Sequence, residues 1–414
     1  MPRLVLVVLA ALASAILGAL PASSTSAQED PEQPAVVVIG APGLTLADLS
    51  PEATPTLWEL AKGGATANLV VRGGYLQTCG VDGWLSLGAG DRVAVPRPES
   101  PDLEDPAAAP ACPVPESDDI GAVAGWSEIT DLAGERKADA TLGVLADSLR
   151  AAGTCVEPTG GPAARLAAAD RNGEVGDGSA GCAVRLVDAG TVRWQGPRRS
   201  ELVRSVDAQV REATKGLPPA TLVVVAGLGD DGSGPQLRAV IYSGGPDASR
   251  GMWAEPGELR SATTRRAGVV QLPDLTADIL DRVGAEPVAP VAGRPLTLVR
   301  DGRPGEAEQR IAAQSDVAGQ LAAANRSIPP FFYGFATVIV LAALLGTAAW
   351  MALRRKDSRA RGVASLALRG VALSLASVPA ATFVATMTRW WTSDRPTLAL
   401  AGVVALGALA LGVI

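Results

Sequence analysis

Four side chains with potentially reactive oxygen atoms follow apolar runs of the sequence. Thr78 comes after the run 67–71, Asp188 after the run 183–187, and Asp230 and Asp231 after the run 222–226. Carboxylate oxygens are the ligands that hard cations such as Mg²⁺ and Ca²⁺ prefer. A bound cation would activate the Thr78 hydroxyl as a nucleophile. One hypothesis is therefore a single-cation site of Asp230, Asp231 and Asp188 beside a catalytic Thr78.

The same residues have a structural interpretation, which we favour. Asp230 and Asp231 stand between Gly229 and Gly232, and aspartates in glycine-rich turns commonly accept hydrogen bonds from nearby backbone amides. A threonine such as Thr78, just before a predicted helix, is a common helix cap. The chain contains no histidine, the side chain that most often serves as a base near neutral pH. On this interpretation we expect no cofactor and no catalysis.

The elements that would position these residues alternate between strands and helices. The run 36–39 is short, apolar and β-branched, which is typical of a strand buried on both faces, and the loop 40–43 follows at its carboxyl end. A helix begins after Ser50 or Thr54, each followed by proline, and ends at Gly63-Gly64.

Further segments continue this alternation. Helices are predicted over 141–152 and 202–213, and short strands at 67–71, 155–156, 183–187 and 222–225. The alternation predicts an α/β fold, with a mainly parallel sheet sandwiched by helices. Ligands of such sheets bind at the carboxyl ends of the strands, where the four candidate residues lie.

Several motifs, in order, resemble the alkaline phosphatase-like superfamily, which includes sulfatases and nucleotide pyrophosphatases. Thr78 has Leu85 seven and Gly88 ten residues on, a spacing similar to that around the nucleophile of the family. The other matching stretches cover both ends of residues 35–300: 54–61, 221–232, 264–280 and 293–296. The resemblance implies a nucleophile at Thr78 and a metal loop at Asp230-Asp231.

The sequence departs from the family at its metal ligands. The first-loop aspartate of the family corresponds to Pro42, which has no donor atom, and the histidine of its Asp-His-Gly loop corresponds to Asp231. A two-zinc site of imidazoles and carboxylates cannot form from these residues. The resemblance therefore implies a domain that keeps the fold and has lost the metal chemistry.

All four cysteines, Cys79, Cys112, Cys155 and Cys182, lie in the region predicted to be exported. An even number of cysteines in an oxidising compartment predicts two disulfides, for which three pairings are possible. We favour Cys79 with Cys112 and Cys155 with Cys182, because each closes a moderate loop. The proline-rich, acidic stretch 95–119 is predicted to be an exposed loop.

The ends of the chain indicate export and a membrane. Residues 1–27 have a basic tip, an apolar core and small residues at the end, which predicts a signal peptide or an N-terminal anchor. Residues 35–300 form the predicted extracytoplasmic domain and 301–330 a linker. Three transmembrane helices are predicted within 331–414, over 331–353, 370–388 and 396–414. The basic residues 354–356 place the first loop in the cytoplasm, with the large domain outside.

Two further expectations concern the source and the extent of the chain. The last apolar run has no polar flank, which favours a piece of a longer multi-pass protein. Scarce lysine with abundant alanine, glycine, arginine and proline indicates a GC-rich genome, such as that of an actinobacterium.

Three function classes follow. The first, which we favour, is a non-catalytic binding or scaffolding module of the cell envelope. The second is a metal-dependent phospho- or sulfo-ester hydrolase or transferase using Thr78. The third places transport or lipid-linked glycan chemistry in the membrane part. Expected partners are the membrane, other envelope proteins or lipid-linked glycans, and the net charge of -7 argues against nucleic acid.

Overall fold

The computed structural model describes most of the 414 residues. The described ranges are 35–75, 77–97, 112–113, 121–135, 140–176, 181–193, 198–218, 220–230, 236–244, 255–301, 306–353 and 358–413. The predicted signal peptide or anchor and most of the predicted loop 95–119 lie outside these ranges, as does Asp231.

The domain predicted to be extracytoplasmic, residues 35–300, is called the ectodomain. It is built on one sheet of nine strands in the order β3-β4-β1-β5-β6-β2-β8-β7-β9. The strands are β1 (Val36–Gly40), β2 (Ala65–Val70), β3 (Val156–Thr159), β4 (Val184–Asp188), β5 (Leu222–Ala226), β6 (Leu237–Gly244), β7 (Gly257–Arg260), β8 (Val269–Gln271) and β9 (Thr297–Arg300). Only β6 and β9 run antiparallel to their neighbours. The sheet is therefore mostly parallel, as the alternation of elements predicted.

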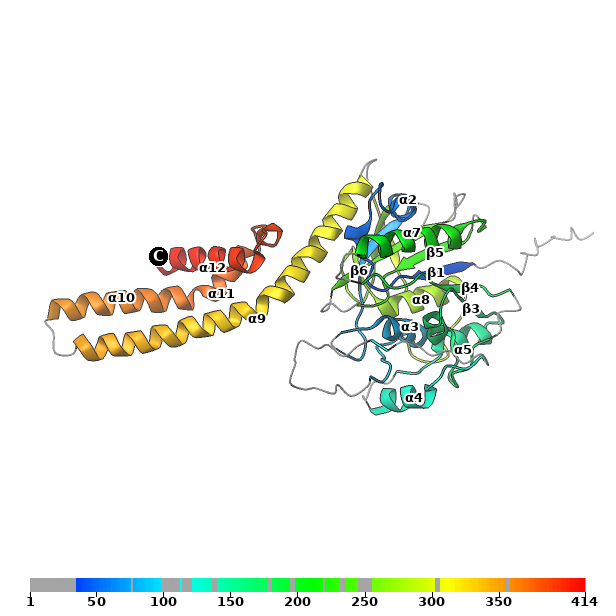
Figure 1. The fold of residues 1–414 in the computed structure, drawn as a ribbon, viewed down its shortest axis with the longest axis horizontal. Coiled ribbons are helices and arrows are strands. Elements are labelled where there is room, and N and C mark those ends of the chain that lie inside the picture. The colour runs from blue at the N-terminus through cyan, green and yellow to red at the C-terminus, as the bar shows by residue number, and fades with distance from the viewer. Residues whose placement is uncertain are drawn as a thin grey trace, which may run out of the picture.

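The helices of the ectodomain cover both faces of this sheet (Figure 1). They are η1 (Leu46–Asp48), α2 (Pro55–Gly63), α3 (Gly80–Ala89), α4 (Trp126–Glu135), α5 (Val144–Ala151), α6 (Ala163–Ala168), α7 (Arg199–Thr214) and α8 (Leu272–Arg282). Along β1, Val36 and Val38 face the core formed with α3, α5, α6 and α8, whereas Val37 and Ile39 face α2 and α7. This alternation buries β1 on both faces, which explains its continuous apolar sequence.

The first predicted elements form with small shifts. Helix α2 begins at Pro55 with Thr54 as its N-cap, the second of the two expected starts. Strands β1 and β2 point the same way but are not neighbours, because β5 and β6 lie between them. Helix α5 starts at Val144 rather than at residue 141, after Gly143 in a left-handed conformation.

The predicted linker 301–330 is helical over most of its described length. Helix α9 (Glu306–Leu353) runs without interruption from the ectodomain into the apolar region. Its first turns pack on the ectodomain: Arg310, Ile311 and Gln314 are at most 6% exposed. The described part of the predicted linker is therefore largely helical, and its first turns pack on the ectodomain.

The remaining helices run alongside the far end of α9 (Figure 1). They are α10 (Ser358–Ala376), α11 (Val378–Ala385), η2 (Trp390–Thr392) and α12 (Pro396–Val413). Judged by length and composition within the described residues, α9 can cross a membrane, and α10 with α11 makes a second span if their 46° bend is counted within one span. The described part of α12 is a shorter apolar helix. The three apolar segments predicted from the sequence are thus helical, but only one or two of them meet this test.

Candidate functional site

A cavity of 270 Å³ lies at the carboxyl edge of the parallel strands. Pro42 from the loop after β1 and Asp188 at the end of β4 form part of its wall. Gly80, at the start of α3, and Trp84, one turn later, form another part. The position is the one at which open α/β sheets bind ligands.

Thr78 lies beside this edge but is fully buried and does not line the cavity. Its hydroxyl accepts a hydrogen bond from the backbone N–H of Gly73 at 2.7 Å. Thr78 does not cap α3, in contrast to the structural interpretation of the sequence. The N-cap is Cys79, whose N–H donates to the Asp82 carboxylate at 2.8 Å. The cap shifts by one residue because Asp82, at the third helical position, is the acceptor for the Cys79 amide.

Asp230 is hydrogen-bonded to the backbone of Thr78. The Asp230 N–H donates to the Thr78 carbonyl at 2.6 Å, and the Thr78 N–H donates to Asp230 Oδ2 at 3.4 Å. Helix α3 approaches the loop of Asp230 closely, since a Cβ at Gly83 would overlap the Leu228 carbonyl. Thr78 and Asp230 are far apart in the sequence, and the fold brings their two loops into contact.

The carboxylate of Asp230 is engaged by a cation supplied by the protein itself. Arg238 of β6 donates to Asp230 Oδ1 from Nη2 at 2.6 Å and from Nε at 3.1 Å. Arg238 Nη1 donates to the carbonyl of Gly43, in the loop after β1, at 3.2 Å. Both side chains are fully buried. Burial raises the pKa of Asp230, and the guanidinium opposes that rise.

A second buried ion pair lies on the other side of the Thr78 loop. Asp82 accepts from Arg97 Nη2 at 2.7 Å and from the Val95 N–H at 2.9 Å. Arg97 also donates to the Gln77 carbonyl at 2.6 Å and lies over the Tyr75 ring, with Cζ 4.1 Å from its centre. Burial raises the pKa of Asp82 although Arg97 opposes it. This network fixes the loop that carries Thr78.

Asp188 is placed differently from Asp230. It lines the 270 Å³ cavity, and its carboxylate accepts from the backbone N–H of Gly190 at 3.0 Å and from that of Ala163. Burial is the main cause that raises the pKa of Asp188. Asp188 therefore stabilises the turn after β4 and the start of α6 through backbone hydrogen bonds.

The residues do not fit a metal centre in the part of the chain that the structure describes. No group of three or more carboxylate, thiol or imidazole side chains there is arranged to hold an ion. The third predicted ligand, Asp231, lies outside the described residues. The Asp230 carboxylate accepts hydrogen bonds from Arg238 and from backbone amides. A cation site needs several oxygen ligands that point to one position and are free to bind the ion.

The two disulfides have the favoured pairing, Cys79 with Cys112 and Cys155 with Cys182. Cys112 and the following Pro113 line the cavity, as Asp188 does. The first disulfide therefore holds Cys112 beside Cys79, the N-cap of α3. Neither cysteine of this pair is a free thiol.

Trp84, Thr191 and Arg193 line the cavity, and the sequence analysis missed all three; Trp84 is the most buried of them. Its side chain is fully buried, and its indole N–H has no hydrogen-bond partner among the described residues. Gly40, at the end of β1, leaves room for the indole, because a Cβ at that position would overlap the Trp84 ring. The glycine at the end of the first apolar run is the sequence feature that would have drawn attention to a large side chain there.

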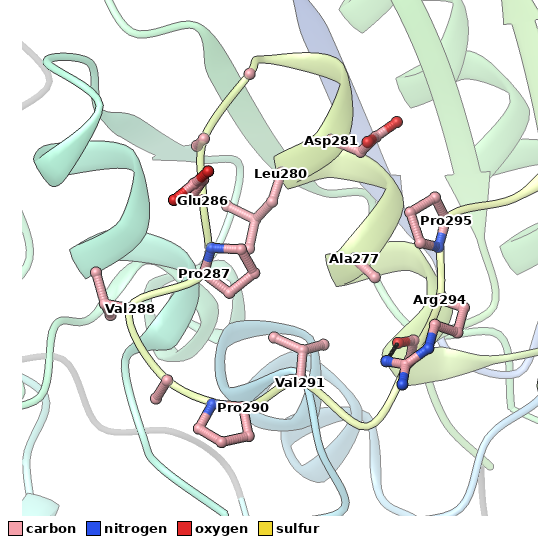
Figure 2. A pocket seen from close by; sticks show the side chains of 14 residues that line it. Ala277, Leu280, Asp281, Glu286, Pro287, Val288, Pro290, Val291, Arg294 and Pro295 are labelled. Atoms are coloured by element: carbon pink, nitrogen blue, oxygen red, sulfur yellow. Dashed lines mark hydrogen bonds between the residues drawn. The ribbon is translucent and has the colours of Figure 1, made fainter.

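A larger hollow, of 680 Å³, lies away from these residues (Figure 2). It is enclosed by the second half of α8 and the proline-rich loop that follows, with Glu286 and Arg294 on opposite sides. The Arg294 N–H donates to Asp274 at 3.0 Å, which holds this loop against the start of α8. The hollow contains none of the predicted catalytic or metal-binding residues.

Comparison with known proteins adds no relative. No family model matches the chain, and no curated protein matches it.

Proposed function

We propose that the chain is a membrane-tethered, extracytoplasmic domain of the alkaline phosphatase-like type that binds and does not catalyse. The observation that carries this proposal is the buried ion pair of Asp230 and Arg238 beneath Thr78. In the family that the sequence resembles, the aspartate corresponding to Asp230 holds a metal ion. Here its counter-ion is a guanidinium built into strand β6.

The order of elements supports the choice of family. Strand β1 lies between β4 and β5, Thr78 precedes helix α3, and Asp230 follows β5. The contact between Thr78 and Asp230 is the one expected if these loops once formed a common site. The closing strand and helix suggested by residues 264–280 correspond to β8 and α8.

The chemistry of the ion pair argues against metal-dependent hydrolysis. A guanidinium remains charged at all ordinary pH values, so Arg238 neutralises Asp230 permanently. Unlike a metal ion, it offers no open coordination position and does not lower the pKa of a bound water or hydroxyl. Thr78 is fully buried with its hydroxyl bonded to the Gly73 amide, so a substrate has no path to it without rearrangement.

Binding is the function that the remaining geometry suits. The 270 Å³ cavity at the strand edge is lined by polar and charged residues, Asp188, Thr191 and Arg193, beside the indole of Trp84. We propose this cavity and its rim as the contact point for a component of the cell envelope, either another protein or a lipid-linked glycan. Cys112, bonded to Cys79, lies at the same edge.

Helix α9 supplies the tether. It is one helix from the buried Arg310 to the apolar residues of its second half, and Pro329 and Pro330 lie inside it near the start of the apolar part. The basic residues 354–356 after α9 favour a cytoplasmic position for the first loop, which leaves the ectodomain outside.

Turnover assays on the full chain in detergent test the proposal. Generic phosphomonoesters, phosphodiesters and sulfate esters would be offered with Mg²⁺, Ca²⁺ or Zn²⁺, and Thr78→Ala would serve as the matched variant. We expect rates equal to those without protein for both chains. Metal-dependent turnover that disappears in Thr78→Ala would contradict the proposal and restore the hydrolase hypothesis.

A further inference from the structure

An apolar groove of 570 Å³ lies between the helices beyond the ectodomain. It is formed by the parts of α9, α10, α11 and α12 nearest the ectodomain, and its wall is almost entirely apolar. Residues that line it include Phe331, Gly334, Val338, Leu375, Ala401 and Leu409. We call this feature the membrane groove. Its volume is within the range of small-molecule binding sites, about 300–1,000 Å³.

The membrane groove has the length of one lipid leaflet. It extends along α12 from Thr397 to Leu409, which corresponds to about 18 Å of helix. Half of a hydrocarbon core of about 30 Å is similar in length. It starts at Pro330 and Thr397, the end nearer the ectodomain, where the Trp390–Trp391 pair also lies. An acyl chain of the leaflet on that side would therefore fit along it.

The mouth of the membrane groove is positively charged. Ser327 and Thr397 share a hydrogen bond of 3.0 Å at this end. Arg326 precedes Ser327, and Arg395 lies two residues before Thr397; both arginines are exposed. The first backbone amides of α12 add the positive end of its dipole. Together they provide groups that bind a phosphate.

Acidic groups near the mouth do not cancel this charge. Asp316 is paired with Arg389 at 2.8 Å and also accepts from the Trp391 indole at 2.9 Å. Asp394 is exposed next to Arg395. Arg326 and Arg395 together leave a net positive charge beside the helix N-terminus, so an anionic headgroup is favoured over a zwitterionic one.

We propose that the membrane groove holds one acyl chain of an anionic phospholipid, with the phosphate of the headgroup at Arg326, Arg395 and the start of α12. This inference rests on the membrane placement proposed above. It assigns to the membrane part a lipid-binding function that is separate from the binding cavity of the ectodomain.

Two glycines provide a matched test. A Cβ at Gly334, which lines the membrane groove, or at Gly402, which does not, meets nothing within 4 Å. Leucine is therefore accommodated at either position, and both substitutions add the same apolar side chain to an apolar helix. Gly334→Leu fills the groove, whereas Gly402→Leu leaves it open.

The experiment is native mass spectrometry of the full chain released from nanodiscs that contain phosphatidylglycerol and phosphatidylcholine. We expect one phosphatidylglycerol per chain in the wild type and in Gly402→Leu, and roughly tenfold lower retention in Gly334→Leu. Arg395→Gln is expected to reduce the preference for phosphatidylglycerol over phosphatidylcholine.

Several outcomes would overturn the inference. Equal retention in Gly334→Leu and Gly402→Leu, or equal binding of both lipids by the wild type, excludes a selective site in this groove. A change in the number of chains per particle in Gly334→Leu, with lipid unaffected, assigns the groove to contact between copies. Failure of the wild type to enter nanodiscs at all would instead contradict the membrane placement on which the inference rests.

Discussion

Arg238 Nη2 lies 2.6 Å from Asp230 Oδ1, with both side chains fully buried and with the Thr78 amide on the other carboxylate oxygen. The pair joins strand β6 to the loop after β5, and through Gly43 to the loop after β1. The Arg238 guanidinium therefore links three loops at the carboxyl edge of the sheet: those of Gly43 and Asp230 directly, and that of Thr78 through Asp230.

Removing the guanidinium alone is expected to be costly. Arg238→Met leaves the Asp230 carboxylate buried without its counter-ion, and we expect a loss of about 3–5 kcal/mol in the free energy of unfolding. The double variant Asp230→Asn with Arg238→Met buries no charge and should recover part of that loss. Denaturant unfolding of the full chain in detergent, followed by tryptophan fluorescence, measures both. Equal stability of wild type and Arg238→Met would show that the pair does not form.

The contact between α9 and the sheet gives a second prediction. Gln314 accepts from the Thr66 hydroxyl at 2.7 Å and donates to Glu258 at 3.2 Å. Gln314→Leu leaves these partners without their bonds, at a cost of about 1–3 kcal/mol, and should loosen the first turns of α9. Hydrogen exchange over residues 306–320 would increase. The control Gln309→Leu changes an exposed glutamine of the same helix and should leave exchange unchanged.

The titration of Asp188 should contribute to the pH dependence of the free energy of unfolding. Its pKa is raised in the folded state by burial, so the folded state binds a proton more readily than the unfolded chain. The resulting stabilisation is complete below the unfolded pKa, about 3.9, and is lost as pH rises through the raised folded pKa. Asp188→Asn does not titrate. It should therefore gain stability relative to wild type as pH rises from about 3.9.

Unfolding of both proteins across acidic and neutral pH measures this difference. A constant difference between Asp188→Asn and wild type over that range would show that the Asp188 pKa is not raised by folding.

The disulfides give a fourth prediction. Cys155 and Cys182 close a loop of 27 residues. Replacing both by serine should lower the free energy of unfolding by about 3 kcal/mol, through the greater entropy of the unfolded chain. A thermal melt compared with wild type under oxidising conditions tests this. A melt that is unchanged by the double substitution, while wild type responds to reductant, would indicate that only the Cys79–Cys112 bond stabilises the domain.

Local sequence patterns predicted much of the sheet. Strand β1 is a continuous apolar run because both its faces are buried, and the proline after Thr54 marked the start of α2. Of the three possible disulfide pairings, the one that loop lengths favoured is present in the structure. These features depend on neighbouring residues, so they can be recognised without the fold.

The features that were missed depend on distant partners. Arg238 is a charged residue in a strand otherwise suited to burial, and only the fold shows that Asp230 faces it. The segment 301–330 was predicted only as a linker between the domain and the apolar helices. Arg310 and Gln314 are buried because they bond to the ectodomain, Arg310 to the carbonyl of Ala61 and Gln314 to Thr66. In a sequence, such contacts leave a charged or amide side chain at a position where the period of the helix or strand predicts an apolar residue.

The central claim is that Arg238, and no metal ion, is the counter-ion of Asp230. Crystals of the full chain soaked in Mn²⁺ would test it most directly, because anomalous scattering locates a bound ion and the density shows the guanidinium. We predict no anomalous peak beside Asp230 and a guanidinium within hydrogen-bond distance of its carboxylate. A peak at coordination distance from Asp230, with Arg238 turned away, would contradict the account.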